Sequence, residues 1–152
     1  MNRPGEALVA AYRAIACDLD GVVYRGARAV PFAVSSLQAS QAYTPVVFAT
    51  NNASRTPTEV AGQLEGLGLT GTGADAVVTS AQAGAALLRS RLGPGAVVLA
   101  VGGDGVAEAL ADAELRPMRT LAARPEAVLQ GWARTVTVAD LADASLAVAD
   151  GA

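Results

Sequence analysis

Short apolar runs alternate with longer amphipathic stretches along the chain, and this alternation predicts strands that alternate with helices. The apolar runs at residues 14–17, 46–49, 76–79, 96–101 and 127–130 are short enough for buried strands. Helices are expected between or after these runs, from Pro31, from Pro57, over residues 80–92, over residues 106–113 and over residues 137–149. A strand–helix–strand order predicts an α/β fold with a parallel sheet.

Two of the expected helices carry clear start signals. Thr56-Pro57-Thr58-Glu59 has a capping residue, a proline at the first helical position and a glutamate three residues after the cap. Asp140 stands in the corresponding position behind Thr137. The helix from Pro31 is expected to carry Phe32, and the apolar side chains expected to be buried by the helix from Pro57 are Val60, Leu64 and Leu67.

Composition narrows the classes of function. The 152 residues carry a formal charge of −3, so there is no basic surface of the kind that binds nucleic acid or an anionic membrane. No stretch reaches the roughly 18 apolar residues of a membrane span, and residues 1–6 lack the plan of a signal peptide, so we expect a cytoplasmic protein. One cysteine, Cys17, excludes an internal disulfide.

Two absences restrict the chemistry further. The chain has no histidine, which excludes Ser-His-Asp and Cys-His nucleophiles and histidine-ligated zinc. All of its cationic side chains are arginine, with no lysine. Acid–base chemistry therefore falls to the carboxylates.

The strongest chemical pattern is an acidic pair at the end of the first apolar run. Asp18 and Asp20 follow residues 14–17, and Gly21 comes directly after them, which predicts a sharp turn. Side chains two residues apart on a strand point the same way, so both carboxylates can face one crevice. An Asp-Leu-Asp-Gly surface turn without chemistry is an equally ordinary interpretation, because Asp and Gly are common turn residues.

A second strand end repeats this design. The run at residues 46–49 leads into Thr50-Asn51-Asn52-Ala53-Ser54-Arg55. In open α/β sheets, ligands bind beyond the carboxyl ends of the strands, so this polar stretch and the acidic pair are expected to face one site. Taken alone, the same stretch also suits a polar loop before the next helix.

Together the two stretches resemble motifs of the haloacid dehalogenase superfamily of phosphohydrolases. Asp18-Leu19-Asp20-Gly21 resembles the first motif and Thr50-Asn51-Asn52 the second, and the spacing is similar to the NagD-like, nitrophenylphosphatase-like branch with a large α/β cap. The resemblance implies a Rossmann-like parallel core, with its N-terminal part over residues 1–79, followed by an incomplete cap over residues 80–152. The expected partner is a small phosphorylated metabolite such as a sugar phosphate, phosphoglycolate or a nucleotide monophosphate.

The resemblance also implies roles for individual residues. Asp18 would be the nucleophile that forms an aspartyl-phosphate, and Asp20 the general acid and base. Asp18 and the backbone carbonyl of Asp20 would ligate Mg²⁺. Thr50 and Asn51 would bind the phosphoryl oxygens, with Asn52 and Arg55 as further phosphate-binding candidates.

The chain also departs from the family pattern. The family has a lysine in its third motif and a further acidic metal ligand in its fourth, and neither has a counterpart here. We therefore expect the front half of a longer Mg²⁺-dependent phosphatase, inactive alone, with an exposed sheet edge that favours a homo-oligomer. If the chain is complete, the alternative is a non-catalytic binding or interaction module on a degraded scaffold of this family.

One glycine-rich stretch, Gly102-Gly103-Asp104-Gly105, invites comparison with a dinucleotide-binding loop. Glu108 stands where the third glycine of that fingerprint belongs. A tight turn from strand to helix is therefore favoured over a nucleotide site.

Overall fold

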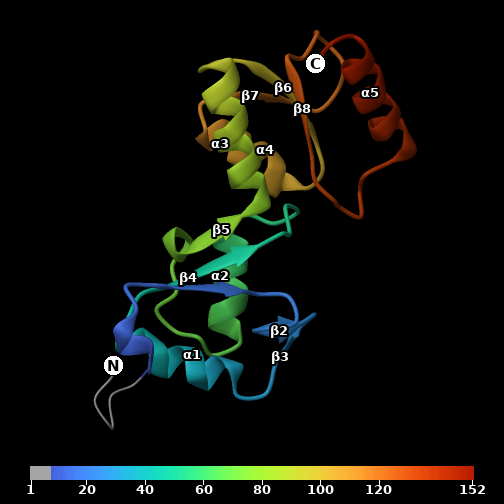
Figure 1. Ribbon diagram of the computed structural model, residues 1–152. Helices are drawn as coiled ribbons and strands as arrows, with labels where there is room; N and C mark the ends of the chain where they lie inside the picture. Colours follow the sequence, from blue (N-terminus) through green and yellow to red (C-terminus); the bar gives the residue numbers. More distant parts are fainter. Residues whose placement is uncertain (1–7) are drawn as a thin grey trace. The chain divides into compact units, whose positions relative to one another are not determined.

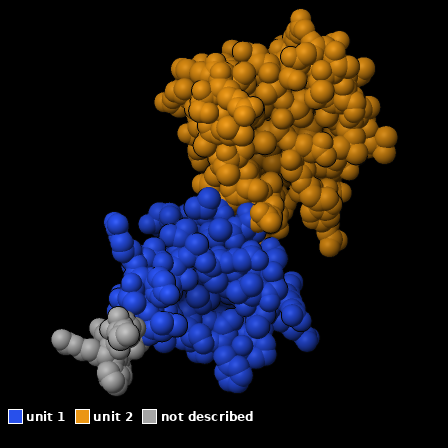
Figure 2. Space-filling view, viewed as in Figure 1, with its two compact units in different colours: residues 1–50, 57–78 blue, residues 51–56, 79–152 orange. Residues whose placement is uncertain are grey.

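The computed structural model describes residues 8–152, so the segment in which we found no signal peptide lies outside the described residues. The chain divides into two compact units, which are described separately. Among the described residues, unit 1 comprises residues 8–50 and Pro57–Val78, and unit 2 comprises Asn51–Thr56 and Thr79–Ala152 (Figure 2). The short segment Asn51–Thr56 therefore leaves unit 1 and belongs to unit 2, although it lies between two stretches of unit 1 in the sequence.

Unit 1 is built on a three-stranded sheet with the strand order β1-β4-β5 (Figure 1). Strand β1 pairs in parallel with β4, with Cys17 opposite Phe48 and Asp18 opposite Ala49. The bounds of its elements are η1 Leu8–Ala11, β1 Ile15–Asp18, β2 Tyr24–Arg25, β3 Arg28–Ala29, α1 Ala33–Gln41, β4 Val46–Thr50, α2 Pro57–Gly66, η2 Ala74–Ala76 and β5 Val77–Thr79.

One face of this sheet is packed and the other is open. Side chains alternate along the strands, so Cys17 and Phe48 enter the core with α1 and α2, whereas Ala16 and Ala49 are exposed. Val60 and Leu64 of α2 are fully buried and Leu67 packs against them, as expected. Parallel sheets are normally covered on both faces, so the open face is consistent with self-association. Self-association itself stays a prediction.

Unit 2 is a three-layer arrangement around a second parallel sheet, of order β7-β6-β8. Val98 and Ala100 of β6 pack with α3 and α4, while Leu99 and Val101 pack with Ala144 and other residues on the side of α5. The bounds are α3 Ser80–Leu92, β6 Val97–Val101, α4 Asp104–Asp112, β7 Arg116–Met118, β8 Ala127–Gln130 and α5 Val138–Ala149. The α/β fold with parallel strands predicted from the sequence is confirmed.

The structure corrects two details. Strand β7 was not predicted, because Pro117 interrupts a short run; the strand lies at the sheet edge, where a residue without an N–H is tolerated. Phe32 does not belong to α1 but precedes it as the N-cap, with a left-handed backbone at φ 65° and 83% of its surface exposed.

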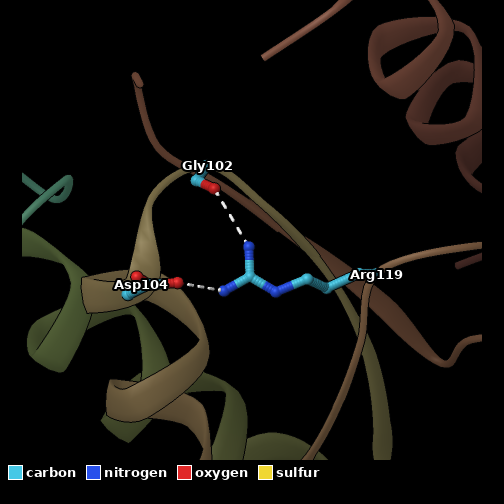
Figure 3. Close-up of polar contacts among 3 residues, drawn as sticks. All are labelled: Gly102, Asp104 and Arg119. Atoms are coloured by element: carbon cyan, nitrogen blue, oxygen red, sulfur yellow. Dashed lines mark hydrogen bonds and ion pairs between the residues drawn. The ribbon is translucent and has the colours of Figure 1, made fainter. Parts of the chain in front are cut away.

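The stretch Gly102–Gly105 is a tight turn between β6 and α4, as favoured from its spacing. A Cβ on Gly103 would lie 2.3 Å from the carbonyl oxygen of Ser54, and one on Gly105 2.4 Å from that of Arg55. Arg119 crosses the turn and donates hydrogen bonds to Asp104 at 2.7 Å and to the Gly102 carbonyl at 3.4 Å (Figure 3). The glycines thus allow the segment 51–56 to pack closely against the start of α4.

Candidate active site

The turn that carries Asp18 and Asp20, called the acidic turn below, lies at the end of β1. Cys17 and Leu19 are buried, and Asp18 and Asp20 between and after them are exposed. The carbonyl of Leu19 accepts hydrogen bonds from the backbone N–H groups of three residues, at positions 22, 23 and 24. Gly21 takes φ +87°, a backbone conformation that other residues rarely adopt. The buried leucine therefore anchors the turn and leaves both carboxylates on its exposed side.

Thr50 lies close to the acidic pair within unit 1. It ends β4, next to the pairing of Asp18 with Ala49, and is buried with 5% of its surface exposed. Its Oγ1 donates a hydrogen bond to Oδ2 of Asp20 at 3.4 Å, while Oδ1 of Asp18 accepts one from the backbone N–H of Leu19 at 2.8 Å. Three of the predicted site residues therefore meet at the carboxyl ends of neighbouring parallel strands.

The remaining predicted site residues, Asn51, Asn52 and Arg55, belong to unit 2. The carbonyl of Asn51 accepts a hydrogen bond from the Ser80 hydroxyl at 2.8 Å. Oδ1 of Asn52 accepts from the backbone N–H of Ser54 at 2.9 Å and from its hydroxyl at 2.6 Å. These bonds give the segment a defined local conformation, and the phosphate-binding role of its three residues stays a prediction.

The environment of Cys17 contrasts with that of the carboxylates. Burial raises the pKa of its thiol, and the neighbouring charge of Asp18 raises it further. Its Sγ donates a hydrogen bond to the Asp18 carbonyl at 3.2 Å. A thiol held protonated is a poor nucleophile, so Cys17 is a poor candidate for covalent chemistry.

Asp18 and Asp20 form a donor set suited to a hard cation. Mg²⁺ prefers oxygen ligands, often takes only one or two carboxylates, and keeps several waters. Within residues 8–152, no group of three or more His, Cys, Asp or Glu side chains gathers into a metal site. The acidic turn thus suits a divalent cation that keeps several waters rather than an ion fully enclosed by these residues.

Sequence reasoning missed the direct bond between Thr50 and Asp20, because their pairing depends on the register of β1 with β4. It also missed the β2–β3 hairpin, where Arg25 lies opposite Arg28. A Gly at position 26 between the two short runs was the available signal.

Comparison with known proteins matches the sequence of this chain to one family. The family model described as haloacid dehalogenase-like hydrolase matches residues 15–116. D-glycerol 3-phosphate phosphatase of Mycobacterium tuberculosis is 50% identical over 135 residues, which make up 89% of this chain and 37% of that protein. Acid sugar phosphatase of Staphylococcus epidermidis is 34% identical over 142 residues, or 93% of this chain and 53% of that protein.

Solved structures agree with this match. Crystal structures of glycerol phosphate phosphatase from Mycobacterium tuberculosis, one with calcium and one with magnesium, each have a TM-score of 0.89 and 44% identity. The match covers 97% of this chain and 43% of that chain for the calcium complex, and 95% and 44% for the magnesium complex. The chain thus spans about half or less of the length of these relatives. Among residues 8–152 no helix is both long and apolar enough to cross a membrane.

Proposed function

Because this chain belongs to the haloacid dehalogenase-like hydrolase family, we propose that it is part of a Mg²⁺-dependent phosphatase acting on a small phosphate monoester. The observation that carries the proposal is the meeting of Asp18, Asp20 and Thr50 at the carboxyl ends of β1 and β4. Ligands bind at this edge in open α/β sheets. Two exposed carboxylates there supply both a nucleophile and an acid–base group.

In the proposed reaction, a carboxylate oxygen of Asp18 attacks phosphorus. A bond forms between that oxygen and phosphorus, and the bond from phosphorus to the alcohol oxygen of the substrate breaks. The carboxyl group of Asp20 gives its proton to the departing oxygen. Water then attacks phosphorus, Asp20 accepts a proton from it, and Asp18 is released together with inorganic phosphate. Splitting the displacement in this way replaces one difficult step by two easier ones.

Thr50 is proposed to act first on Asp20. Its hydroxyl donates to Oδ2 of Asp20 and so restricts the orientation of the acid–base carboxyl group. We assign the phosphoryl oxygens to Thr50, Asn51, Asn52 and Arg55, whose hydroxyl, amide and guanidinium groups are suitable donors for an anion.

Asp18 and the backbone carbonyl of Asp20 are the proposed holders of Mg²⁺. When bound, the ion supplies positive charge that screens a carboxylate nucleophile from an anionic phosphate. Magnesium and calcium are bound in the crystal structures of the related glycerol phosphate phosphatase, which supports a divalent cation here.

For the domain organisation, we propose that residues 1–79 form the N-terminal part of a catalytic core and residues 80–152 part of an α/β cap. The division of the chain between Val78 and Thr79 and the separate sheets of the two units support this. The segment Asn51–Thr56 is then a piece of the core sequence that packs with the cap, through Gly103 and Gly105.

The names of the relatives support a proposal for the substrate class. Relatives named D-glycerol 3-phosphate phosphatase and acid sugar phosphatase match most of this chain, so we propose a sugar phosphate or polyol phosphate ahead of phosphoglycolate or a nucleotide monophosphate. The 152 residues contain no lysine to balance the phosphate charge. We therefore expect no turnover by these residues alone and full chemistry only where a lysine and a further acidic ligand are supplied.

The test uses thermal melting and phosphate release together. We expect millimolar Mg²⁺ to raise the melting temperature of the chain slightly, through mass action on the folded state, and Asp18→Asn to remove the rise. Asp75→Asn, at an exposed aspartate elsewhere in unit 1, is the control and should keep it. Where a longer form of the protein hydrolyses glycerol phosphate, Asp18→Asn should abolish turnover. Full activity of that variant would refute the proposal.

The second candidate is a binding module, favoured by the missing lysine. It predicts no response to Mg²⁺ and a saturable response to an organic ligand. The same melting experiment, repeated with glycerol 3-phosphate in place of Mg²⁺, separates the two.

A further inference from the structure

The β2–β3 hairpin places two arginines against each other. It is an antiparallel pair in which Arg25 lies directly opposite Arg28 and Tyr24 opposite Ala29. Gly26 allows the tight connection with φ +59°. Like charges directly opposite in a ladder are destabilising, so this register carries an electrostatic cost that the hairpin itself does not relieve.

No acidic partner offsets the two charges within the described part of the chain. Among residues 8–152, neither Arg25 nor Arg28 forms an ion pair or a side-chain hydrogen bond, although Asp18 and Asp20 lie only a few residues earlier. By contrast, Arg89 and Arg119 of unit 2 do form ion pairs, with Glu114 and with Asp104. Both guanidinium groups therefore keep their donors available.

The two arginines also share a cavity of about 300 Å³, lined by Arg25, Arg28, Ala29, Val30 and Pro31. None of the lining residues is acidic, and the apolar groups of Val30 and Pro31 form the rest of the wall. Guanidinium groups bind carboxylates and phosphates through charge-assisted hydrogen bonds that are often bidentate. The cavity thus provides room and charge for a compact anion.

The backbone of the hairpin is held in place by contacts with the rest of unit 1. Tyr24 is 1% exposed, and its carbonyl accepts a hydrogen bond from the backbone N–H of Gly21 at 2.7 Å. The Gly26 carbonyl accepts one from Nε2 of Gln63 on α2 at 3.0 Å. Because these contacts fix the backbone between the arginines, only the two side chains have to be ordered when a ligand binds.

We propose that Arg25 and Arg28 form an anion-binding site, distinct from the phosphoryl position at Asp18 and Thr50. Its ligand is a compact anion with at least two negative charges, either a phosphate group or a dicarboxylate. The backbone of Tyr24, next to Arg25, forms an isolated β-bridge with that of Asp20. The hairpin lies beyond the end of β1 (Figure 1). An anion on the hairpin therefore sits beside the acidic turn and reduces the positive charge next to it.

The test is a nuclear magnetic resonance titration of the 152-residue chain at constant ionic strength, since screening alone weakens exposed charges. The probes are inorganic phosphate and malonate, and the readout is the side-chain Nε–H resonances of the arginines. Those of Arg25 and Arg28 are assigned by their loss in Arg25→Gln and Arg28→Gln. We expect these two resonances to shift together with one dissociation constant, while that of Arg13, exposed in the same unit, stays unchanged.

Response to both probes identifies a general dianion site, and response to phosphate alone identifies a phosphate site. Melting provides a second measurement. Phosphate should raise the melting temperature of the wild type and of Arg13→Gln, but not of Arg25→Gln/Arg28→Gln. The backbone resonance of Thr50 reports binding at the candidate active site separately, so the two sites can fail independently. Absence of a saturable shift at Arg25 and Arg28, or equal shifts at all arginines, would overturn the anion site.

Discussion

The hydroxyl of Thr50 lies 3.4 Å from Oδ2 of Asp20 and donates a hydrogen bond to it. The two residues are thirty positions apart, and they meet because β4 runs parallel to β1 in the register that places Ala49 opposite Asp18. This contact connects the proposed acid–base carboxyl group of Asp20 to the neighbouring strand. The orientation of that carboxyl group therefore depends on the single hydroxyl of Thr50.

Replacing Thr50 by valine removes that hydroxyl and keeps the shape of the side chain. We expect proton transfer through Asp20 to suffer, with a fall in phosphatase turnover of about 10-fold or more in a form that has activity. Stability should change by about 1 kcal/mol or less, because Asp20 is exposed and water can replace the lost donor. Thr50→Ser keeps the hydroxyl and is the control. Equal turnover of the valine and serine variants, measured by phosphate release, would contradict the role given to Thr50.

Phe32 is held in a left-handed backbone conformation that costs a non-glycine residue about 1–2 kcal/mol. Its side chain is 83% exposed and makes no side-chain cap to α1, so little is gained in return. We expect Phe32→Gly to raise the free energy of unfolding by roughly 0.5–1 kcal/mol, after allowing for the extra freedom of glycine in the unfolded chain. Tyr43→Gly, at another exposed aromatic residue with negative φ, should instead lower it. Urea unfolding of both variants gives the comparison.

Gly105 and Gly62 are both helical glycines, with opposite surroundings. A Cβ at Gly105 would lie 2.4 Å from the Arg55 carbonyl oxygen, whereas one at Gly62 would meet nothing within 4 Å. We expect Gly105→Ala to destabilise unit 2 by about 2 kcal/mol or more, because backbone must move. Gly62→Ala should stabilise the chain by roughly 0.5–1 kcal/mol. If thermal melts show the two substitutions to be equivalent, the packing of residues 51–56 on α4 is incorrect.

Asp140 makes the stability of the start of α5 depend on pH. Hydrogen bonds from the backbone N–H and the hydroxyl of Thr137 lower the pKa of its carboxyl below the ordinary 3.8. A lowered folded-state pKa means that the contribution of the charged group to stability is present above pH 3.8 and is lost as the pH falls through the folded-state value. The difference in melting temperature between wild type and Asp140→Asn should therefore be constant at neutral pH and shrink below about pH 4. A difference that grows on acidification would be inconsistent with this cap.

Several features of the molecule were readable from residue order. Apolar runs gave the strands β1, β4, β6 and β8 to within a residue or two, because burial demands apolar side chains at fixed local spacing. The helix-start pattern at Thr137 and Asp140 was equally local and forms the capping box of α5. The acidic pair, with Gly21 behind it, identified the candidate site for the same reason.

Other features depended on contacts between distant segments, which residue order alone does not contain. The bond from Thr50 to Asp20 and the opposition of Arg25 to Arg28 are consequences of strand register. The need for glycine at position 105 comes from the carbonyl of Arg55, fifty residues earlier. This close approach agrees with the assignment of Asn51–Thr56 to unit 2. Local pattern thus determined most of the longer elements and the candidate site residues. Tertiary packing decided which of these residues meet, because register and close approach are settled only when whole strands and helices pack.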